Sequence, residues 1–539
     1  MSCGPARSYA ASVPLRRLAA IAVAATLAAC AGSSGDGEPP PATRATAAPR
    51  SIETIASEPT ASEPATSGVD VATTSTTVPA PLEYSIEFED LGAGVEGGWV
   101  TVPLDYDDPQ GATLDLWVTR HRTESDGRVG VLFANNGGPG VPASSIAAGV
   151  RGWVEDPLVE RFDVVSWDPR GTGESGGAVD CIDDADYDRF FASADITPED
   201  DAEREELIAL ARDFADNCIA AVGVDVLPHL GTNNTARDMD AIRQALGEDQ
   251  VSYLGYSYGS ELGAVWATLF PDTVRAAVLD GAAHPDPDGI EPAKQQQLGF
   301  ERVFNAFLAE CSATPSCAFH NDGDAEGAFD ALLQRLDDEP APGPAGRAAV
   351  NQEVAINGVI QAMYTDRRWP ALERALADAA AGDGSGLLAL HDSYFQRDPQ
   401  DGSYSNLLES FQAITCADEP DRLTPDEADA RAAELIGVAP RLFPYTTASY
   451  TCDFFPDPDD PRAEVTGERA GPIVVIGTTG DPSTPLESSA AMADALEEGV
   501  LVTVEANRHT AYRSGSCIND VVHEYLIWLE APAPDTRCP

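Results

Sequence analysis

The chain is poor in lysine and in positive charge. Lys294 is the only lysine among 539 residues, and 89 acidic residues outnumber 33 basic ones, so the formal net charge is −56 at pH 7. A field this negative repels phosphate groups and argues against nucleic-acid binding. It favours solubility and the attraction of cationic ligands. A solvated acidic surface without a specific partner is the plainer interpretation, and nothing in the composition indicates an oligomeric state.

Several motifs of metal and cofactor sites are missing. The sequence contains no C-x-x-C, H-E-x-x-H, Walker A or EF-hand pattern, so we predict no metal and no cofactor. Gly171–Gly176 does fit G-x-G-x-x-G and follows an expected strand. A dinucleotide site, however, requires a helix that begins in the glycine loop, and residues 177–181 show no helical periodicity. We therefore interpret this match as a decoy.

Leu18–Leu27 is an apolar run, but it is too short for a transmembrane helix. It follows Arg16 and Arg17, as in an export signal. Leu27-Ala28-Ala29-Cys30 resembles a bacterial lipobox, which predicts removal of residues 1–29 and a lipid anchor on Cys30. With a lipoprotein signal or with a plain secretory signal, we expect export, either to the outer face of the cell membrane or into the medium.

Aromatic and long aliphatic residues are nearly missing from residues 31–81, which are rich in Ala, Ser, Thr, Pro and Glu. Such a composition buries too little apolar surface to compensate for the loss of chain entropy on ordering. We therefore predict that residues 30–81 form a disordered tether between the anchor and the folded body.

Cysteine usage agrees with export. Of ten cysteines, Cys3 leaves with the signal and Cys30 takes the lipid, and an even number remains, which predicts four disulfides in an oxidising compartment. The simplest pairing is sequential: Cys181–Cys218, Cys311–Cys317, Cys416–Cys452 and Cys517–Cys538.

Short apolar strands alternate with helices from about Leu82 onward. Strands are expected at residues 98–104, 113–119, 129–134, 163–167, 250–254, 276–280, 472–477 and 500–505. The alternation predicts an α/β fold with a doubly wound, mostly parallel sheet. The sheet pattern stops near residue 285 and resumes near 466, and the stretch between them is mostly helical. We therefore expect a core of residues 82–285 and 466–539, with a helical cap domain of residues 286–465, here called the insert.

Residues Gly255-Tyr256-Ser257-Tyr258-Gly259 fit the G-x-S-x-G pattern of a nucleophile elbow. An expected strand precedes them and an expected helix, residues 260–270, follows. A serine on such a sharp turn presents its hydroxyl at the top of the sheet, and glycines are needed because side chains there would collide with neighbouring elements. Ser257 is the predicted nucleophile.

A serine nucleophile needs a base and a group that orients the base, in the order Ser, Asp or Glu, His. His509 follows the last expected strand in a loop and is the predicted base, whereas His523 lies on a probable terminal helix. Asp481 follows the preceding strand and is the predicted acid, with Asp280 as the alternative. Thr484 is placed to hydrogen-bond near the Asp481 carboxylate.

An oxyanion hole is predicted beside the nucleophile. Asn135-Asn136-Gly137-Gly138-Pro139-Gly140 directly follows an expected strand, and glycine amides allow close approach. We expect one donor from Gly137 or Gly138 and another from the backbone of Tyr258.

These motifs resemble the exported tripeptidyl-aminopeptidase-like branch of the α/β hydrolases, which is related to proline iminopeptidases. The similar segments are GWVTVPLDY at 98–106, NGGPG at 136–140, WDPRGTGES at 167–175, GYSYGS at 255–260, VLDG at 278–281, ITCAD at 414–418 and GTTGDPSTP at 477–485. They span most of residues 95–515 in the family's order.

The resemblance implies an α/β-hydrolase fold with a helical cap, a Ser257–Asp481–His509 triad, and release of di- or tripeptides from free peptide N-termini. A carboxylesterase or lipase on the same triad is the alternative, and a non-catalytic binding lipoprotein is a third. Members of the family often carry Gly-His-Gly around the base, whereas this chain has Arg508-His509-Thr510, so we expect a difference in loop geometry there.

An exopeptidase must bind a terminal ammonium group, and carboxylates in the insert are suited to do so. The candidates include Glu301, Glu310, Asp418 and Glu419, and the sequence does not choose among them.

Overall fold

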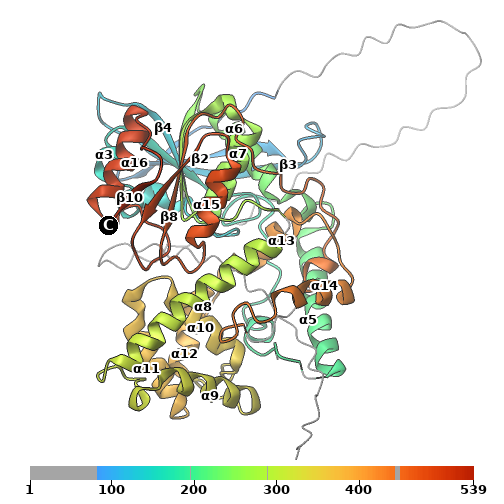
Figure 1. The fold of residues 1–539 in the computed structure, drawn as a ribbon. Coiled ribbons are helices and arrows are strands. Elements are labelled where there is room, and N and C mark those ends of the chain that lie inside the picture. Colours follow the sequence, from blue (N-terminus) through green and yellow to red (C-terminus); the bar gives the residue numbers. More distant parts are fainter. Residues whose placement is uncertain (1–81, 195, 199, 288, 444–448) are drawn as a thin grey trace, which may run out of the picture.

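The computed structural model describes residues 82–539 except 195, 199, 288 and 444–448 (Figure 1). The predicted export signal, the predicted lipid attachment site Cys30 and the predicted tether lie outside the described residues. No helix in the described part of the chain is long and apolar enough to cross a membrane.

A ten-stranded mixed sheet forms the upper part of the molecule in Figure 1, in the order β1-β2-β3-β5-β4-β6-β7-β8-β9-β10. The first strands pair antiparallel, up to the β3–β5 pair, and all neighbours from β5 to β10 are parallel. The mostly parallel sheet confirms the predicted fold class, although the edge strands β1 and β10 were not predicted. The strands are β1 Glu89–Gly92, β2 Val95–Pro103, β3 Thr113–His121, β4 Gly130–Asn135, β5 Phe162–Trp167, β6 Val251–Tyr256, β7 Val274–Asp280, β8 Ile473–Thr478, β9 Gly499–Val504 and β10 Thr536–Cys538.

Helices cover both faces of the sheet, so strands β4, β5, β6 and β8 are buried throughout. Successive side chains of a strand point to opposite faces. Leu132 and Leu254 belong to one apolar cluster, whereas Phe133 and Tyr253 belong to the other. The first face carries α1 Ser145–Ala148, α2 Val150–Trp153, α3 Asp156–Val159 and α16 Ser516–Trp528; the second carries α6 Thr232–Ala245, α7 Tyr258–Leu269 and α15 Leu486–Ala495.

The insert is built mainly of helices and lies below the sheet in Figure 1. Its longest helix, α8, places Phe300, Phe304 and Phe307 on one buried face at helical spacing. Phe304 packs edge-to-face on Phe329 of α9, so aromatic burial joins the two helices. The helices are α8 Ile290–Ala313, α9 Ala325–Asp338, α10 Gln352–Met363, α11 Trp369–Ala380, α12 Ser385–Tyr394, α13 Leu407–Asp418 and α14 Pro425–Ala432.

A segment outside the insert packs against it. Helix α5, Asp201–Val222, lies beside α14 (Figure 1), and its Leu207 and Ile208 share an apolar cluster with α14. Arg204 of α5 forms ion pairs with Asp426 and Asp429 of α14. The predicted core range 82–285 includes this segment, and the structure shows that α5 also packs against α14 of the insert.

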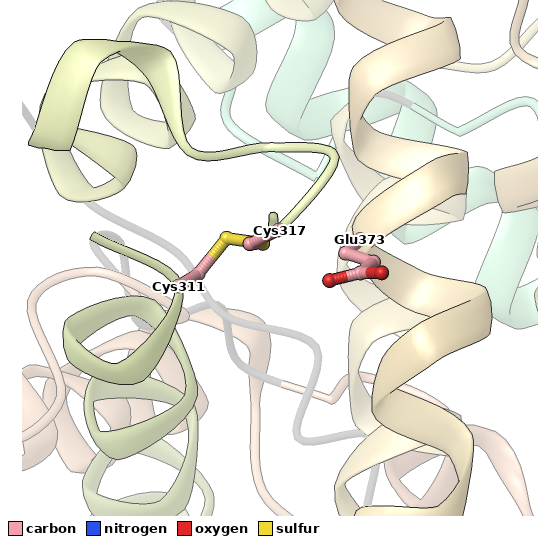
Figure 2. A group of neighbouring side chains, drawn as sticks. All are labelled: Cys311, Cys317 and Glu373. Carbon is pink, nitrogen blue, oxygen red and sulfur yellow. A yellow bond between two sulfur atoms is a disulfide. The ribbon is translucent and has the colours of Figure 1, made fainter. Parts of the chain in front are cut away.

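Four disulfides join the eight cysteines of the described residues, and their pairing is sequential. Cys181–Cys218 ties the loop before helix α4, Tyr187–Phe191, to α5, and Cys517–Cys538 ties α16 to the edge strand β10. Cys311–Cys317 closes the end of α8 (Figure 2), and Cys416–Cys452 lies inside the insert. Each link shortens the loops of the unfolded chain and thereby favours the folded state.

Candidate active site

Ser257 lies on the sharp turn between β6 and α7, at φ 54° and ψ −124°. A Cβ atom at Gly255 would lie 2.2 Å from the carbonyl oxygen of Gly259, and one at Gly259 would lie 2.8 Å from Asn135 Oδ1, so both positions require glycine. Ser257 is fully buried, and its Oγ has no hydrogen-bond partner among the described residues. Its hydroxyl is therefore not committed to any structural contact.

His509 and Asp481 form a buried pair on the loops that follow β9 and β8. His509 Nδ1 lies 2.9 Å from both Asp481 Oδ1 and Oδ2. The carboxylate also accepts the backbone N–H groups of Ser483 at 2.9 Å, Thr484 at 2.8 Å and Thr510 at 3.3 Å. Because an ionised carboxylate only accepts hydrogen bonds, Nδ1 carries the proton and Nε2 is left as the basic nitrogen.

Thr484 adds a side-chain contact to this pair. Its Oγ1 lies 3.1 Å from Asp481 Oδ2 and 3.2 Å from His509 Nδ1. The threonine therefore lies against both groups, as the sequence suggested.

Asp280, the alternative acid, joins the elbow to the base loop. Its carbonyl oxygen accepts the Ser257 N–H at 2.9 Å, and its carboxylate accepts the N–H groups of Ala511 at 2.8 Å and Tyr512 at 2.7 Å. Burial raises the pKa of Asp280 to about 6, although the two N–H groups oppose the shift. The hydrogen bonds of this carboxylate fix the backbone of the base loop. Asp280 therefore suits a role in positioning that loop better than the role of the acid that orients the His509 imidazole.

His523, the other late histidine, lies on α16, and its Nε2 is 2.9 Å from the hydroxyl of Tyr512. Its ring thus serves a helix–loop contact.

The insert contacts the base loop directly. The His509 N–H donates to the carbonyl oxygen of Tyr364 at 3.2 Å, and the two rings meet edge-to-face with centroids 5.5 Å apart. One residue along, Thr365 pairs with Arg508 in an isolated antiparallel bridge. The backbone of the predicted base is therefore held by the insert as well as by the core.

Thr510 follows the predicted base at φ 62°. This left-handed region suits glycine, and a β-branched residue rarely adopts it. Thr510 stands where family members often carry the second glycine of Gly-His-Gly. The loop therefore keeps a glycine-like backbone turn despite the different residue.

Glycines 137 and 138 lie beside the elbow at φ 78° and 58°. A Cβ atom at Gly137 would lie 2.9 Å from Ser257 Cβ, so this loop packs directly on the nucleophile candidate. The Gly137 N–H donates to Asn135 Oδ1 at 2.8 Å and is already engaged. Tyr258 is the first residue of α7, and its N–H has no acceptor inside the helix. The candidate oxyanion donors are therefore the N–H groups of Gly138 and Tyr258.

A cavity of about 260 Å³ contains Ser257 and Tyr258 in its wall. The same wall holds three carboxylates, from Glu261, Asp418 and Glu419, and one arginine, Arg462. Arg462 forms an ion pair with Glu261. The cavity beside the nucleophile candidate therefore carries an excess of acidic groups.

Asp418 is linked to the elbow by hydrogen bonds. Its Oδ1 accepts a hydrogen bond from the Thr232 N–H, and its Oδ2 accepts one from the Thr232 hydroxyl, both at 2.6 Å. Thr232 Oγ1 lies 2.7 Å from the hydroxyl of Tyr258. Burial, followed by the charge of Glu261, raises the pKa of Asp418 to about 7. Burial also raises the pKa of Glu419.

The structure separates the acidic candidates of the insert. Asp418 and Glu419 line the Ser257 cavity. Glu301 accepts the Leu442 N–H at 2.9 Å and has a structural role, and Glu310 lines a different cavity. No sequence motif points to Glu261, although it follows Ser257 by one helical turn in the helix that begins at the elbow.

A buried serine on this turn, with an acid–base pair on later loops of a mostly parallel sheet, defines the class of serine α/β hydrolases. Residues 130–334 match the family model described as alpha/beta hydrolase fold, and residues 417–538 match the model described as TAP-like protein. The chain belongs to this TAP-like family and is a serine hydrolase.

Curated relatives cover most of the chain. Serine protease Hip1 of Mycobacterium tuberculosis (strain ATCC 25618 / H37Rv) is 36% identical over 468 residues, 83% of this chain and 88% of that protein. Carboxylesterase B of the same organism is 35% identical over 450 residues, 81% and 85% of the two chains. Tripeptidyl aminopeptidase of Streptomyces lividans is 30% identical over 477 residues, 84% and 86%. All three names describe hydrolases, but the names imply different substrates. The substrate class must therefore be inferred from the site itself.

Proposed function

We propose that the protein is a serine aminopeptidase that releases di- or tripeptides from free peptide N-termini. The observation that carries the proposal is the acidic wall of the Ser257 cavity, where the carboxylates of Glu261, Asp418 and Glu419 outnumber the one arginine, Arg462, among the described lining residues. A peptide N-terminus is an ammonium group, which carboxylates bind through charge-assisted hydrogen bonds. A neutral acyl ester gains nothing from such a wall. The tripeptidyl aminopeptidase among the relatives supports the same substrate class.

In the proposed mechanism Ser257 Oγ attacks the scissile carbonyl while His509 Nε2 accepts its proton. Asp481 holds the imidazole in the required tautomer through Nδ1 and stabilises the imidazolium. The N–H groups of Gly138 and Tyr258 stabilise the oxyanion. His509 then protonates the leaving amine, and a water molecule, activated by the same histidine, hydrolyses the acyl-enzyme.

The size of the Ser257 cavity limits the length of the peptide that can be released. When the substrate ammonium is held at this wall, only a limited number of residues fits between it and Ser257 within about 260 Å³. The enzyme is therefore expected to release short peptides of fixed length.

The test is a paired assay of purified protein that lacks residues 1–81. One arm labels the protein with a fluorophosphonate. The other compares free and N-acetylated Ala-Pro-Ala chromogenic amides with a short acyl ester. Labelling with turnover of only the free-amine peptide supports the aminopeptidase. Labelling with ester turnover alone favours the carboxylesterase alternative, and turnover of the acetylated peptide favours an endopeptidase.

Ser257→Ala tests the nucleophile. The variant should lose fluorophosphonate labelling and essentially all turnover, because no other group supplies the attacking oxygen. Its melting temperature should stay close to that of the unmodified protein, since the hydroxyl makes no hydrogen bond among the described residues. Retained turnover in a folded variant would place the nucleophile elsewhere.

We also propose that the protein is exported and anchored by lipid on Cys30. The lipobox-like residues 27–30 support this, and four disulfides suit an oxidising compartment. Metabolic labelling with a fatty-acid analogue should mark the full chain in the membrane fraction and fail to mark Cys30→Ser. A soluble, unlabelled full chain in the medium would favour the plain secretory signal.

A further inference from the structure

Helix α13 lies where the insert meets the core (Figure 1), and its last residue, Asp418, lines the Ser257 cavity. In the first turn of α13, the hydroxyl of Ser410 donates to the carbonyl oxygen of Gly171 in the core at 2.7 Å. A Cβ atom at Gly140, at the end of the glycine loop beside the elbow, would lie 2.6 Å from the backbone nitrogen of Phe411. The helix is therefore packed closely on the core before it reaches Asp418.

The carboxylate of Asp418 caps a helix of the core. Helix α6 begins at Thr232, and the residue before it, Gly231, offers no side chain to satisfy the first N–H groups of the helix. Asp418 supplies the acceptor from the insert, because its Oδ1 accepts a hydrogen bond from the Thr232 N–H at 2.6 Å. A Cβ atom at Gly231 would lie 2.9 Å from Asp418 Oδ1, so the glycine leaves room for the carboxylate. The positive end of the helix macrodipole favours the ionised form of an acid at this place.

Thr232 also binds the second oxygen of this carboxylate. Its hydroxyl donates to Asp418 Oδ2 at 2.6 Å and lies 2.7 Å from the hydroxyl of Tyr258. A threonine has one hydroxyl proton, which here goes to the carboxylate, so the Tyr258 hydroxyl is the donor in the second contact. Thr232 is fully buried, and these hydrogen bonds are therefore shielded from water.

The two hydrogen bonds from Thr232 leave Asp418 able to bind a substrate. Each oxygen of an ionised carboxylate offers about two acceptor positions, and Thr232 occupies one on each oxygen. Asp418 lines the Ser257 cavity, whereas Thr232 does not. Thr232 therefore holds the carboxylate from outside the cavity, and the remaining acceptor positions are available to a group inside it.

Charged groups on other elements also act on Asp418. The other acidic or basic side chains among the described lining residues of the cavity are Glu261, His284, Glu419 and Arg462. Burial raises the pKa of Asp418 most, and the charge of Glu261 adds to it, whereas Arg462 and the hydrogen bonds from Thr232 lower the pKa. Thr232 carries no formal charge. Its substitution therefore changes the hydrogen bonds of Asp418 without changing the number of charges around it.

We propose that Thr232 is a positioning residue that keeps Asp418 ionised and directed into the Ser257 cavity, where the carboxylate binds the substrate ammonium group. This inference rests on the proposed aminopeptidase function. A hydrogen bond donated to a carboxylate favours its charged form, so loss of the Thr232 hydroxyl lets Asp418 take up a proton at a higher pH. Because Thr232 belongs to the core and Asp418 to the insert, the acid has this support only while α13 is docked on α6.

Thr232→Val tests the role of the hydroxyl, since it keeps the branched shape of the side chain and the backbone N–H. The measurement is kcat/KM for the free-amine Ala-Pro-Ala chromogenic amide divided by kcat/KM for the short acyl ester, from pH 5.5 to 8. The rise of this ratio on the acid side, here called the acid limb, should move to higher pH by about one unit. The ratio at pH 6 should accordingly fall by up to about tenfold.

Two further variants separate the hydroxyl from a general disturbance of the fold. Thr232→Ser keeps the hydroxyl and should have the acid limb of the parent. Tyr258→Phe removes only the donor to Thr232 and should move the acid limb in the same direction by a smaller amount, because the hydrogen bonds in the chain strengthen one another. If Thr232→Val does not fold, Tyr258→Phe decides the question: a shifted acid limb supports the role of Thr232, and an unshifted one contradicts it.

Thr235→Val is the matched control. Thr235 lies about one turn further along α6 and is also buried, but its hydroxyl donates to the carbonyl oxygen of Gly231 at 3.3 Å. This variant should keep the acid limb of the parent. An unchanged acid limb in a folded Thr232→Val, an equal shift in Thr235→Val, or a shift that persists in Thr232→Ser overturns the role of Thr232 alone. A parent that does not cleave the free-amine peptide overturns the proposed function, and this inference with it.

Discussion

Two residues of the candidate site, Ser257 and Thr510, lie at positive φ, at 54° and 62°. Such conformations cost on the order of 1–3 kcal/mol each for residues other than glycine and persist only where the surroundings impose them. At Ser257 the flanking glycines allow the turn. At Thr510 the N–H donates to Asp481 and the residue is fixed between the acid and the base. The strain therefore falls on the proposed nucleophile and on the residue that follows the proposed base.

Thr510→Gly and Thr510→Ala separate this strain from the threonine contacts. Both remove the side-chain methyl and hydroxyl groups, but only glycine adopts positive φ freely. We expect Thr510→Gly to be more stable than Thr510→Ala by about 1 kcal/mol, measured as the free energy of unfolding. Equal stabilities would show that the turn at residue 510 is not strained.

Asp418→Asn tests the ammonium-binding wall. Burial raises the pKa of Asp418 to about 7, so the carboxylate gains its charge as the pH rises through neutrality. The substrate ammonium group loses its charge above about pH 8. The ratio of peptide to ester kcat/KM should therefore rise from pH 6 and fall again above pH 8. Asp418→Asn should raise KM for the peptide about tenfold at pH 7.5, leave the ester unaffected and abolish the rise of the ratio.

Asp421→Asn is the control for that variant. Asp421 is exposed three residues further along and does not line the cavity. If both variants raise KM equally, general charge attraction explains the effect. The ester serves as an internal reference because the same triad acts on it, so any pH dependence of the triad itself cancels in the ratio.

The roles proposed for individual residues were only partly readable from the sequence. Ser257, Asp481 and His509 follow from chain order and from their places after strands, which are local signals. The choice of Asp418 over Glu301 is not local, because it depends on which face of a helix meets the cavity. That the Gly137 N–H is engaged by Asn135 depends on a side-chain rotamer, which no motif encodes.

At the scale of secondary structure, α13 carries a second unusual acid. Glu409 is 2% exposed, and burial raises its pKa to about 8. The hydroxyl of Tyr187, on α4, donates to its carboxyl group at 3.4 Å. α13 thus holds a carboxyl group that is protonated at neutral pH in the folded state.

Glu409→Gln should stabilise the protein in a pH-dependent way. The folded pKa exceeds the unfolded value, so the folded state of the unmodified protein loses stability as the pH rises from about 4.5 to about 8 and loses no more above that. Glutamine does not titrate. The free energies of unfolding of variant and parent should be similar at pH 5. At pH 8 the free energy of unfolding of the variant should be higher by about 2 kcal/mol or more. A gain that is constant across this range would contradict the assignment of a protonated Glu409.

The existence of most strands could be predicted from local sequence, but the packing of α5 on α14 could not. The strands from β2 to β9 were expected because buried parallel strands are short apolar runs between loops. The docking of α5 on α14 rests on contacts such as Arg204–Asp429, more than 200 residues apart. Its exposed acidic and arginine residues resemble those of any surface helix, so no sequence pattern indicates the partner.

At the scale of the whole molecule, the net charge of −56 is a repulsive term in folding. Raising NaCl from 0.05 M to 0.5 M shortens the screening length to a few ångströms. The melting temperature at pH 7.5 should therefore rise, by about 5 °C, which we take as an order of magnitude. The rise should shrink at pH 5, where some carboxylates are protonated. An equal rise at both pH values would point to general salt effects on apolar surface.

The contact of Tyr364 and Thr365 with Arg508 and His509 has a consequence for protein engineering. Recombining two relatives at the two junctions of the insert would separate these partners. Residues 364 and 365 would then come from the parent that supplies the insert, and residues 508 and 509 from the parent that supplies the core. A chimera made in this way should fold in both parts and still misplace its general base. Transferring the short segment around His509 together with the insert should restore activity, so the functional unit of exchange is discontinuous in the gene.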